Sequence, residues 1–266
     1  MWLGDPGGIS SAVTGPGRVD AIDHHIVGRG VTISDYSTFS RRAAALTVQI
    51  GRRTSEPPRH FVIDATGSKV YGAGEWHRRQ HRVQRRRTWR KLHLVVDTRT
   101  QEVIAAELTA ATVHDAEVFP ALLAPIPAGE SIASMAADGA YETRVCHQRL
   151  LDRQAAALIP PRANAVAWPP RADGQTHPRT AILEYRQQHG DKAWKVHSGY
   201  HRRSLAETAM SRLKTRFGER LSNRRFDTQT TQAYARLAAM NIMTWRAKPY
   251  LHEGSFIPHS IYATKP

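Results

Sequence analysis

The sequence contains a single cysteine, Cys146, which excludes an intramolecular disulfide framework and a cysteine-based zinc site. It also lacks an apolar run long enough to cross a bilayer, and its first residues lack the basic-then-apolar order of a secretory signal. These absences predict a protein of a reducing cytoplasm with no membrane partner. Because 41% of the 266 residues are hydrophobic, the chain can still form a substantial core.

Acidic residues are scarce relative to basic ones: 23 Asp and Glu stand against 38 Lys and Arg, a net charge of +15. Such an excess is typical of proteins that bind a polyanion, most often nucleic acid, and it carries no information about the sequence bound. The densest basic stretch, residues 75–93, is predicted to be a loop that follows the DNA backbone, with a solvated surface as the alternative. The candidate phosphate-binding residues are Arg85, Arg86, Arg87, Arg90 and Lys91, with Lys69 upstream.

The order of expected elements indicates an α/β fold, with a mixed sheet flanked by helices. Three runs rich in β-forming residues come first, at 60–72, 89–98 and 102–110, and the short turn between the last two indicates a hairpin. A helix, a strand ending at Asp138, a second helix and a strand stopped by Pro160 follow. A meander of strands followed by alternating strands and helices predicts both antiparallel and parallel pairing.

Composition divides the chain into three parts. Residues 1–56 are predicted to be partly disordered, with one capped helical pattern at 35–46 and a Pro-rich basic linker. Residues 57–247 are predicted to form the main domain, interrupted before its last long helices by a Pro-rich insertion at 162–198. Residues 248–266 have no pattern and are predicted to be a tail.

Three acidic side chains are placed so that they could converge. Asp64 stands at the expected end of the first strand, Asp138 at the end of a later strand, and Glu207 on a long helix after the insertion. If the two strands are neighbours, both aspartates emerge at one edge of the sheet, and a helix packed across that edge adds Glu207. Clustered carboxylates repel each other and persist only with a neutralising cation. Oxygen ligands suit Mg²⁺, with Mn²⁺ as a substitute, and two such ions promote phosphoryl transfer.

The residues around Glu207 allow more than one interpretation. Four of them share a helix face: Tyr200, Arg203, Glu207 and Lys214. On that face Arg203 and Lys214 could bind phosphate while Glu207 binds metal, but an ordinary i,i+4 ion pair between Arg203 and Glu207 explains the spacing equally well. Ser204 and Glu207 also have the spacing of a capping box, which would start the helix near Ser204; metal ligation predicts a start near His201.

The same residues match a known signature. Tyr200-x2-Arg203-x3-Glu207-x6-Lys214 has every fixed position of the Y-x2-R-x3-E-x6-K signature of bacterial insertion-sequence DDE transposases. With "VIDATGSKVYGAGEW", "RRTWRKLHLVVD" and "AADGAYET", it makes residues 35–246 resemble the insertion-sequence-five group of that family. Four separated motifs in the right order make the resemblance specific.

This resemblance implies a ribonuclease-H-like fold in which Asp64, Asp138 and Glu207 are the catalytic, metal-binding residues. It implies DNA-contacting or site-organising roles for Tyr200, Arg203 and Lys214. It further implies Mg²⁺-dependent cleavage and joining of double-stranded DNA at the terminal inverted repeats of the protein's own mobile element, in the bacterial cytoplasm in association with the nucleoid. Two copies of the chain, a homodimer, could pair the two ends. Of the helical DNA-binding region that precedes the catalytic domain in related transposases, only residues 35–46 resemble a remnant.

Two alternatives to transposition remain open. A stand-alone metal-dependent nuclease on the same fold would cut DNA without joining its ends. A decayed DNA-binding remnant would bind DNA without catalysis, although the presence of all three carboxylates argues against it.

Overall fold

The computed structural model describes residues 36–51, 57–70, 88–247 and 263–264. The contacts divide the chain into two compact units, residues 1–39 and 40–266, and the second unit contains the features discussed here. The last five residues of the basic stretch predicted to be a loop at 75–93 belong to a strand, so the loop prediction is wrong for them. The start that was predicted to be disordered and residues 75–87 of that stretch lie outside the described residues. So does most of the predicted tail.

The helical pattern near the N-terminus is confirmed as α1 (Tyr36–Ala45), which is followed by the short strand β1 (Leu46–Thr47). β1 pairs with β8 (Ala263–Thr264), so the segment predicted to be an unpatterned tail contributes a strand. Strands are predicted from the alternation of apolar and polar residues, which needs at least four residues to be visible. A two-residue strand is too short to show it.

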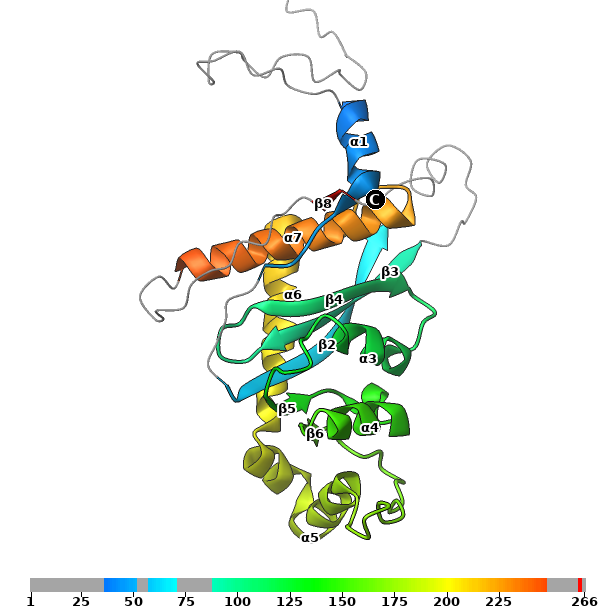
Figure 1. Cartoon of the computed structure of the whole chain (residues 1–266), viewed down its shortest axis with the longest axis vertical. Coiled ribbons are helices and arrows are strands. Elements are labelled where there is room, and N and C mark those ends of the chain that lie inside the picture. Colours follow the sequence, from blue (N-terminus) through cyan, green and yellow to red (C-terminus); the bar gives the residue numbers. More distant parts are fainter. Residues whose placement is uncertain (1–35, 52–56, 71–87, 248–262, 265–266) are drawn as a thin grey trace, which may run out of the picture. The chain divides into compact units, whose positions relative to one another are not determined.

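The central sheet contains six strands in the order β4-β3-β2-β5-β6, with β7 pairing beside β2 (Figure 1). These strands are β2 (Arg59–Val70), β3 (Trp89–Asp97), β4 (Val103–Ala110), β5 (Ile132–Ala136), β6 (Ala156–Leu158) and β7 (Arg220–Leu221). β2, β3 and β4 are antiparallel, whereas β5 and β6 run parallel to β2. The predicted hairpin and mixed sheet are confirmed, β7 was not predicted, and the ribonuclease-H-like class stays a prediction.

Helices cover both faces of this sheet. α3 (Asp115–Leu123) and α4 (Arg144–Asp152) pack on one face, and α6 (Ser204–Phe217) and α7 (Phe226–Ala247) on the other (Figure 1). Successive side chains of a strand point to opposite faces. Phe61 and Ile63 therefore pack with the first pair of helices, and Val62 packs with the second. No helix among the described residues is long and apolar enough to span a membrane.

The prediction that the first strand ends at Asp64 is wrong, because β2 continues to Val70. Gly67 does not interrupt the ladder, and it pairs with Lys91 of β3. A Cβ atom at Gly67 would lie 3.3 Å from the Trp89 ring, so the glycine lets the indole lie against the strand. The glycine signal thus marks a close approach of a side chain and not a turn.

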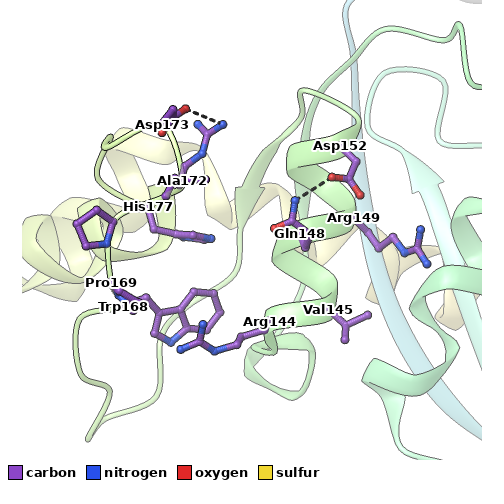
Figure 2. Close-up of a pocket in the computed structure, with 12 residues that line it drawn as sticks. Arg144, Val145, Gln148, Arg149, Asp152, Trp168, Pro169, Ala172, Asp173 and His177 are labelled. Atoms are coloured by element: carbon purple, nitrogen blue, oxygen red, sulfur yellow. Dashed lines mark hydrogen bonds and ion pairs between the residues drawn. The ribbon is translucent and has the colours of Figure 1, made fainter.

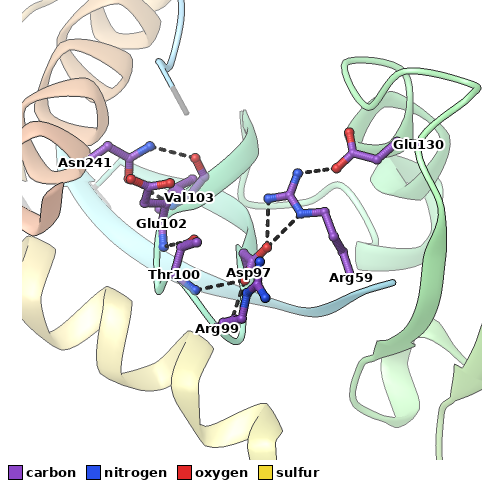
Figure 3. A network of polar contacts seen from close by, with 8 residues as sticks. All are labelled: Arg59, Asp97, Arg99, Thr100, Glu102, Val103, Glu130 and Asn241. Carbon is purple, nitrogen blue, oxygen red and sulfur yellow. Dashed lines mark hydrogen bonds and ion pairs between the residues drawn. The ribbon is translucent and has the colours of Figure 1, made fainter. Parts of the chain in front are cut away.

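A buried polar network holds the start of β2 in place (Figure 3). Arg59 donates from Nε to Asp97 Oδ2 at 2.8 Å, and its guanidinium also pairs with Glu130. Asn241 of α7 accepts from the Val103 amide at 2.9 Å and donates to the Val103 carbonyl at 2.8 Å. These contacts join β2, the β3–β4 hairpin and α7 into one frame.

The insertion contains α5 (Pro178–Ser198), which is broken at Gly190, where φ is 83°. One helical stretch ends at Gly190 and a second follows the break. Arg179 of α5 pairs with Glu142 at 2.7 Å, and both side chains are at least nine-tenths buried. Because Glu142 follows Asp138 by only four residues, this pair attaches the insertion to the segment after that aspartate.

Candidate active site

Asp64 lies at a stretch of one β2 edge that pairs with no other strand in the described part of the chain. On that side β5 pairs with β2 only as far as Val62, and β7 pairs only from Lys69 onward. Asp64 is two residues beyond Val62 and therefore faces α6 and α7, as Val62 does. Its carboxylate is mostly covered, with 16% of the side chain exposed.

Asp138 reaches the same edge from the neighbouring strand. β5 ends at Ala136, and Asp138 begins the short 3₁₀ helix η1 (Gly139–Tyr141) by accepting the Ala140 amide at 2.9 Å. β2 and β5 are parallel neighbours, as predicted. The chain leaving β5 therefore emerges beside Asp64.

Glu207 comes from α6 and meets Asp64 through an arginine. Arg203 donates from Nη1 to Asp64 Oδ2 at 3.0 Å and from Nη2 to Glu207 Oε1. The i,i+4 ion pair considered from the sequence is therefore present, and its arginine also bridges to the sheet. Glu207 is the most accessible of these groups, with 54% of its side chain exposed.

The electrostatics show that the three carboxylates share one neighbourhood. Burial raises the pKa of Asp64, and the negative charges of Asp138 and Glu207 raise it further, while Arg203 opposes them. Tyr200 responds to the same charges: burial raises the pKa of its hydroxyl, and all three carboxylates add to that rise. The predicted convergence on one edge of the sheet is thus present.

Two of the three carboxylates, those of Asp64 and Glu207, pair with the Arg203 guanidinium. Among the residues that the structure describes, no group of three or more His, Cys, Asp or Glu side chains is set to hold a metal ion. Arg203 supplies positive charge to Asp64 and Glu207 in its place. The catalytic and metal-binding roles of Asp64, Asp138 and Glu207 remain predictions.

The capping box does not form at the start of this helix. The Ser204 hydroxyl donates to the His201 carbonyl at 3.0 Å, and Glu207 bonds to Arg203. A 3₁₀ turn, η2 (Tyr200–Arg203), comes first, and α6 follows from Ser204 without a side-chain cap. The α-helix begins at Ser204, the start expected for a capping box, although the box itself does not form, and the 3₁₀ turn begins at Tyr200, close to the start near His201 expected for metal ligation.

Tyr200 and Lys214 lie at opposite ends of the signature. Tyr200 packs on Trp194, with ring centroids 5.0 Å apart, near the carboxylates. Lys214 follows Glu207 by seven residues, about 10 Å along the helix axis. It is half-buried and makes no ion pair with another described residue. The DNA-contacting roles of both residues remain predictions.

Three of the other candidate cations have partners within the fold. Lys69 pairs with Glu219 at 3.0 Å, Arg90 bonds to Gln229 at 2.9 Å, and Lys91 pairs with Asp115 at 2.8 Å. Arg90 and Lys91 belong to β3, whereas Arg85, Arg86 and Arg87 lie outside the described residues. These contacts give Lys69, Arg90 and Lys91 a structural role within the fold. The prediction that these three residues contact DNA stays a prediction.

A pocket of about 770 Å³ lies between α4 and the insertion and was not predicted (Figure 2). The Arg144 guanidinium lies over the Trp168 ring, 5.0 Å from its centroid, and His177 meets the same ring edge-on at 4.8 Å. Arg144 is exposed and makes no ion pair with the other described residues. No local pattern connects residues 24 positions apart, so the sequence carried no signal for this contact.

The chain thus has a mixed sheet with acidic residues gathered at one strand edge. Comparison with known protein families shows to which family a chain with this fold and site belongs. A family model described as a transposase DDE domain matches residues 55–242, and a second model with the same description matches residues 16–73. The chain belongs to the transposase DDE domain family. The predicted class is confirmed, while the insertion-sequence-five group stays a prediction.

Among solved structures, the chain is similar to the piggyBac transposase in a synaptic complex with hairpin DNA. The two are 11% identical with a TM-score of 0.40, and the similarity covers 73% of this chain and 49% of that one. The chain thus spans about half the length of that transposase. At this level of similarity, the activity of the piggyBac transposase is not transferred to this chain.

Proposed function

We propose that this chain is a DDE transposase of the insertion-sequence-five group, which cleaves and joins double-stranded DNA at the terminal inverted repeats of its own element. The observation that carries the proposal is that Asp64 and Asp138 lie at neighbouring parallel strands while Arg203 of the adjoining helical segment joins Asp64 to Glu207. Membership of the transposase DDE domain family supports it. A second copy of the chain is the expected partner when two DNA ends are paired, in the bacterial cytoplasm with the nucleoid.

The donor set fits a divalent metal. Asp64, Asp138 and Glu207 offer only carboxylate oxygens, which Mg²⁺ and Mn²⁺ prefer. The rise in the pKa of Asp64, from burial and from the two other carboxylates, reflects negative charge that a cation would stabilise. When bound, Mg²⁺ would activate the attacking oxygen and stabilise the leaving oxygen of a phosphodiester.

The protein's own contribution is to position these groups. The β2 ladder and the Ala140 amide hold Asp64 and Asp138 in place, and α6 presents Glu207 across the free strand edge. Tyr200 closes the buried side of the cluster through its contact with Trp194. Two paired strands and a packed helix thus hold the backbone of the three acidic residues in place before substrate binds.

DNA would lie across this edge and along the cationic surfaces near it. Arg144 follows Asp138 by six residues, so even an extended chain would place the two Cα atoms within about 20 Å of each other. The buried pair of Arg179 with Glu142 keeps the insertion close to that segment. We therefore include Arg144 and the pocket beside Trp168 in the proposed DNA-binding surface.

An Arg144→Gln variant tests this surface. We expect weaker binding of duplex DNA at every sequence and a log–log salt slope smaller by about 0.9, the value for one phosphate contact. Fluorescence anisotropy at several salt concentrations measures both quantities. Lys192→Gln, on the exposed second half of α5, is the matched control for the lost charge. An unchanged slope in Arg144→Gln would remove this residue from the surface.

Labelled DNA ends test the proposed reaction itself. With Mg²⁺ or Mn²⁺ and duplexes that carry the element's ends, the protein should produce both nicked strands and strands joined to a target plasmid. Denaturing and native gels separate these products. Cleavage without any joined product would favour the stand-alone nuclease. DNA binding that is indifferent to divalent metal, with no cleavage, would favour the decayed remnant.

A further inference from the structure

Arg203 is a permanent cation held between two of the three converging carboxylates. Its guanidinium donates to Asp64 Oδ2 at 3.0 Å and to Glu207, while 23% of its side chain remains exposed. An arginine does not lose its proton in proteins. The charge between Asp64 and Glu207 therefore cannot be removed by pH, and the side chain itself must move to remove it.

A divalent ion bound by Asp64 and Glu207 would need oxygen lone pairs that Arg203 now engages. It would also place like charges in direct proximity, which is unfavourable in a partly buried site. Occupation by the guanidinium and occupation by a metal ion thus compete for the same carboxylates.

Resting on the proposed function, we propose that Arg203 is the resident cation of this acidic cluster and that it exchanges its carboxylates for a DNA phosphate when metal binds. A phosphate offers the planar guanidinium the same two-pronged acceptor geometry that Asp64 and Glu207 now supply. The exchange requires only rotation of a partly exposed side chain. Arg203 then links the two ligands of the site.

This exchange makes metal binding and DNA binding cooperative. A phosphate that draws Arg203 away frees Asp64 and Glu207 for metal, and a metal ion that displaces Arg203 frees the guanidinium for phosphate. By linkage the two effects are equal, so DNA must tighten metal binding by the factor by which metal tightens DNA binding. Without DNA, the arginine keeps the metal affinity low.

Mn²⁺ binding to the full chain tests the exchange without relying on activity. Electron paramagnetic resonance of free Mn²⁺ gives the affinity, with and without duplex DNA. In Arg203→Gln we expect Mn²⁺ to bind up to about fivefold more tightly without DNA, because a competing charge worth roughly as much as a partly exposed ion pair is gone. The additional tightening that DNA causes in the wild type should disappear.

Arg202→Gln is the matched control, since Arg202 is exposed on the same turn and makes no ion pair with another described residue. Arg203→Lys keeps the charge but not the planar fork, so its Mn²⁺ affinity should stay near that of the wild type. It also covers the case in which Arg203→Gln does not fold. Equal gains in Arg202→Gln and Arg203→Gln, or no gain in the latter, would overturn the exchange.

Glu207→Gln separates this inference from the proposed function on which it rests. If Glu207→Gln weakens Mn²⁺ binding while Arg203→Gln leaves it unchanged, the metal site stands and the exchange is wrong. If the wild type binds no Mn²⁺, or if Glu207→Gln binds it as well as the wild type does, the metal site and the exchange both fail. If Glu207→Gln weakens binding and Arg203→Gln strengthens it, both are supported.

Discussion

Glu207→Gln is expected to abolish DNA cleavage while the protein continues to bind DNA. The substitution keeps the size of the side chain but removes one anionic ligand, so the proposed metal site loses a direct donor. Loss of a mere outer-shell partner of a metal costs about 10- to 100-fold in affinity or activity, so we expect a cleavage defect above about a hundredfold. Binding should persist because the exposed side chain adds negative charge that duplex DNA does not need.

Nicking of plasmid DNA with Mg²⁺ measures the cleavage, and anisotropy in the same buffer measures the binding. Glu184→Gln makes the same change at an exposed position of α5 that has no ion-pair partner among the described residues, and it should cleave as the wild type does. Cleavage retained in Glu207→Gln would refute the assignment of this residue.

Asp97→Ala is expected to cost about 3–5 kcal/mol in the free energy of unfolding, the range for breaking a buried ion pair on one side. Arg59 and Asp97 are 5% and 1% exposed, so removal of the carboxylate leaves a buried guanidinium with Glu130 as its remaining ion-pair partner among the described residues. Asp97 also accepts the amides of Arg99 at 2.7 Å and Thr100 at 2.9 Å in the hairpin turn.

Urea unfolding followed by circular dichroism measures this loss. Glu219→Ala removes a carboxylate from an exposed pair with Lys69 and should leave the unfolding midpoint nearly unchanged. Asp97 acts on β2 through its ion pair with Arg59 and has no proposed role in the reaction. Any loss of cleavage by Asp97→Ala should therefore increase with the unfolded fraction as the temperature rises. A stability equal to that of the wild type would show that the network in Figure 3 does not hold the frame.

The sequence predicted the elements well where their periodicity is local. Runs rich in β-forming residues predicted β3 and β4, and the helix predicted around Glu207 is present as α6, although Tyr200 and Arg203 lie in the 3₁₀ turn before it. It misplaced the end of β2, because Gly67 has the appearance of a turn residue although it serves a contact with Trp89. It also missed β7, whose two residues are too few to show a pattern.

For the candidate site, the residue types and their order on strands and helix could be inferred, but their mutual contacts could not. The sequence left the ion pair, the capping box and the metal site open as explanations of Glu207. The structure excludes the capping box and adds Asp64 as a second partner of Arg203. Nothing local distinguishes these outcomes, because the deciding partner lies on a strand far away in the chain.

By itself, the sequence determined the basic charge, the mixed sheet and the signature, since each depends on composition or on neighbours along the chain. Only the tertiary structure decided that Asp64 lies at a gap between β5 and β7, that Arg203 bridges it to Glu207, and that the insertion is tied beside Asp138. The physical reason is that such contacts arise when packed layers bring distant residues within hydrogen-bonding reach, and periodicity along a chain does not record which residues those will be.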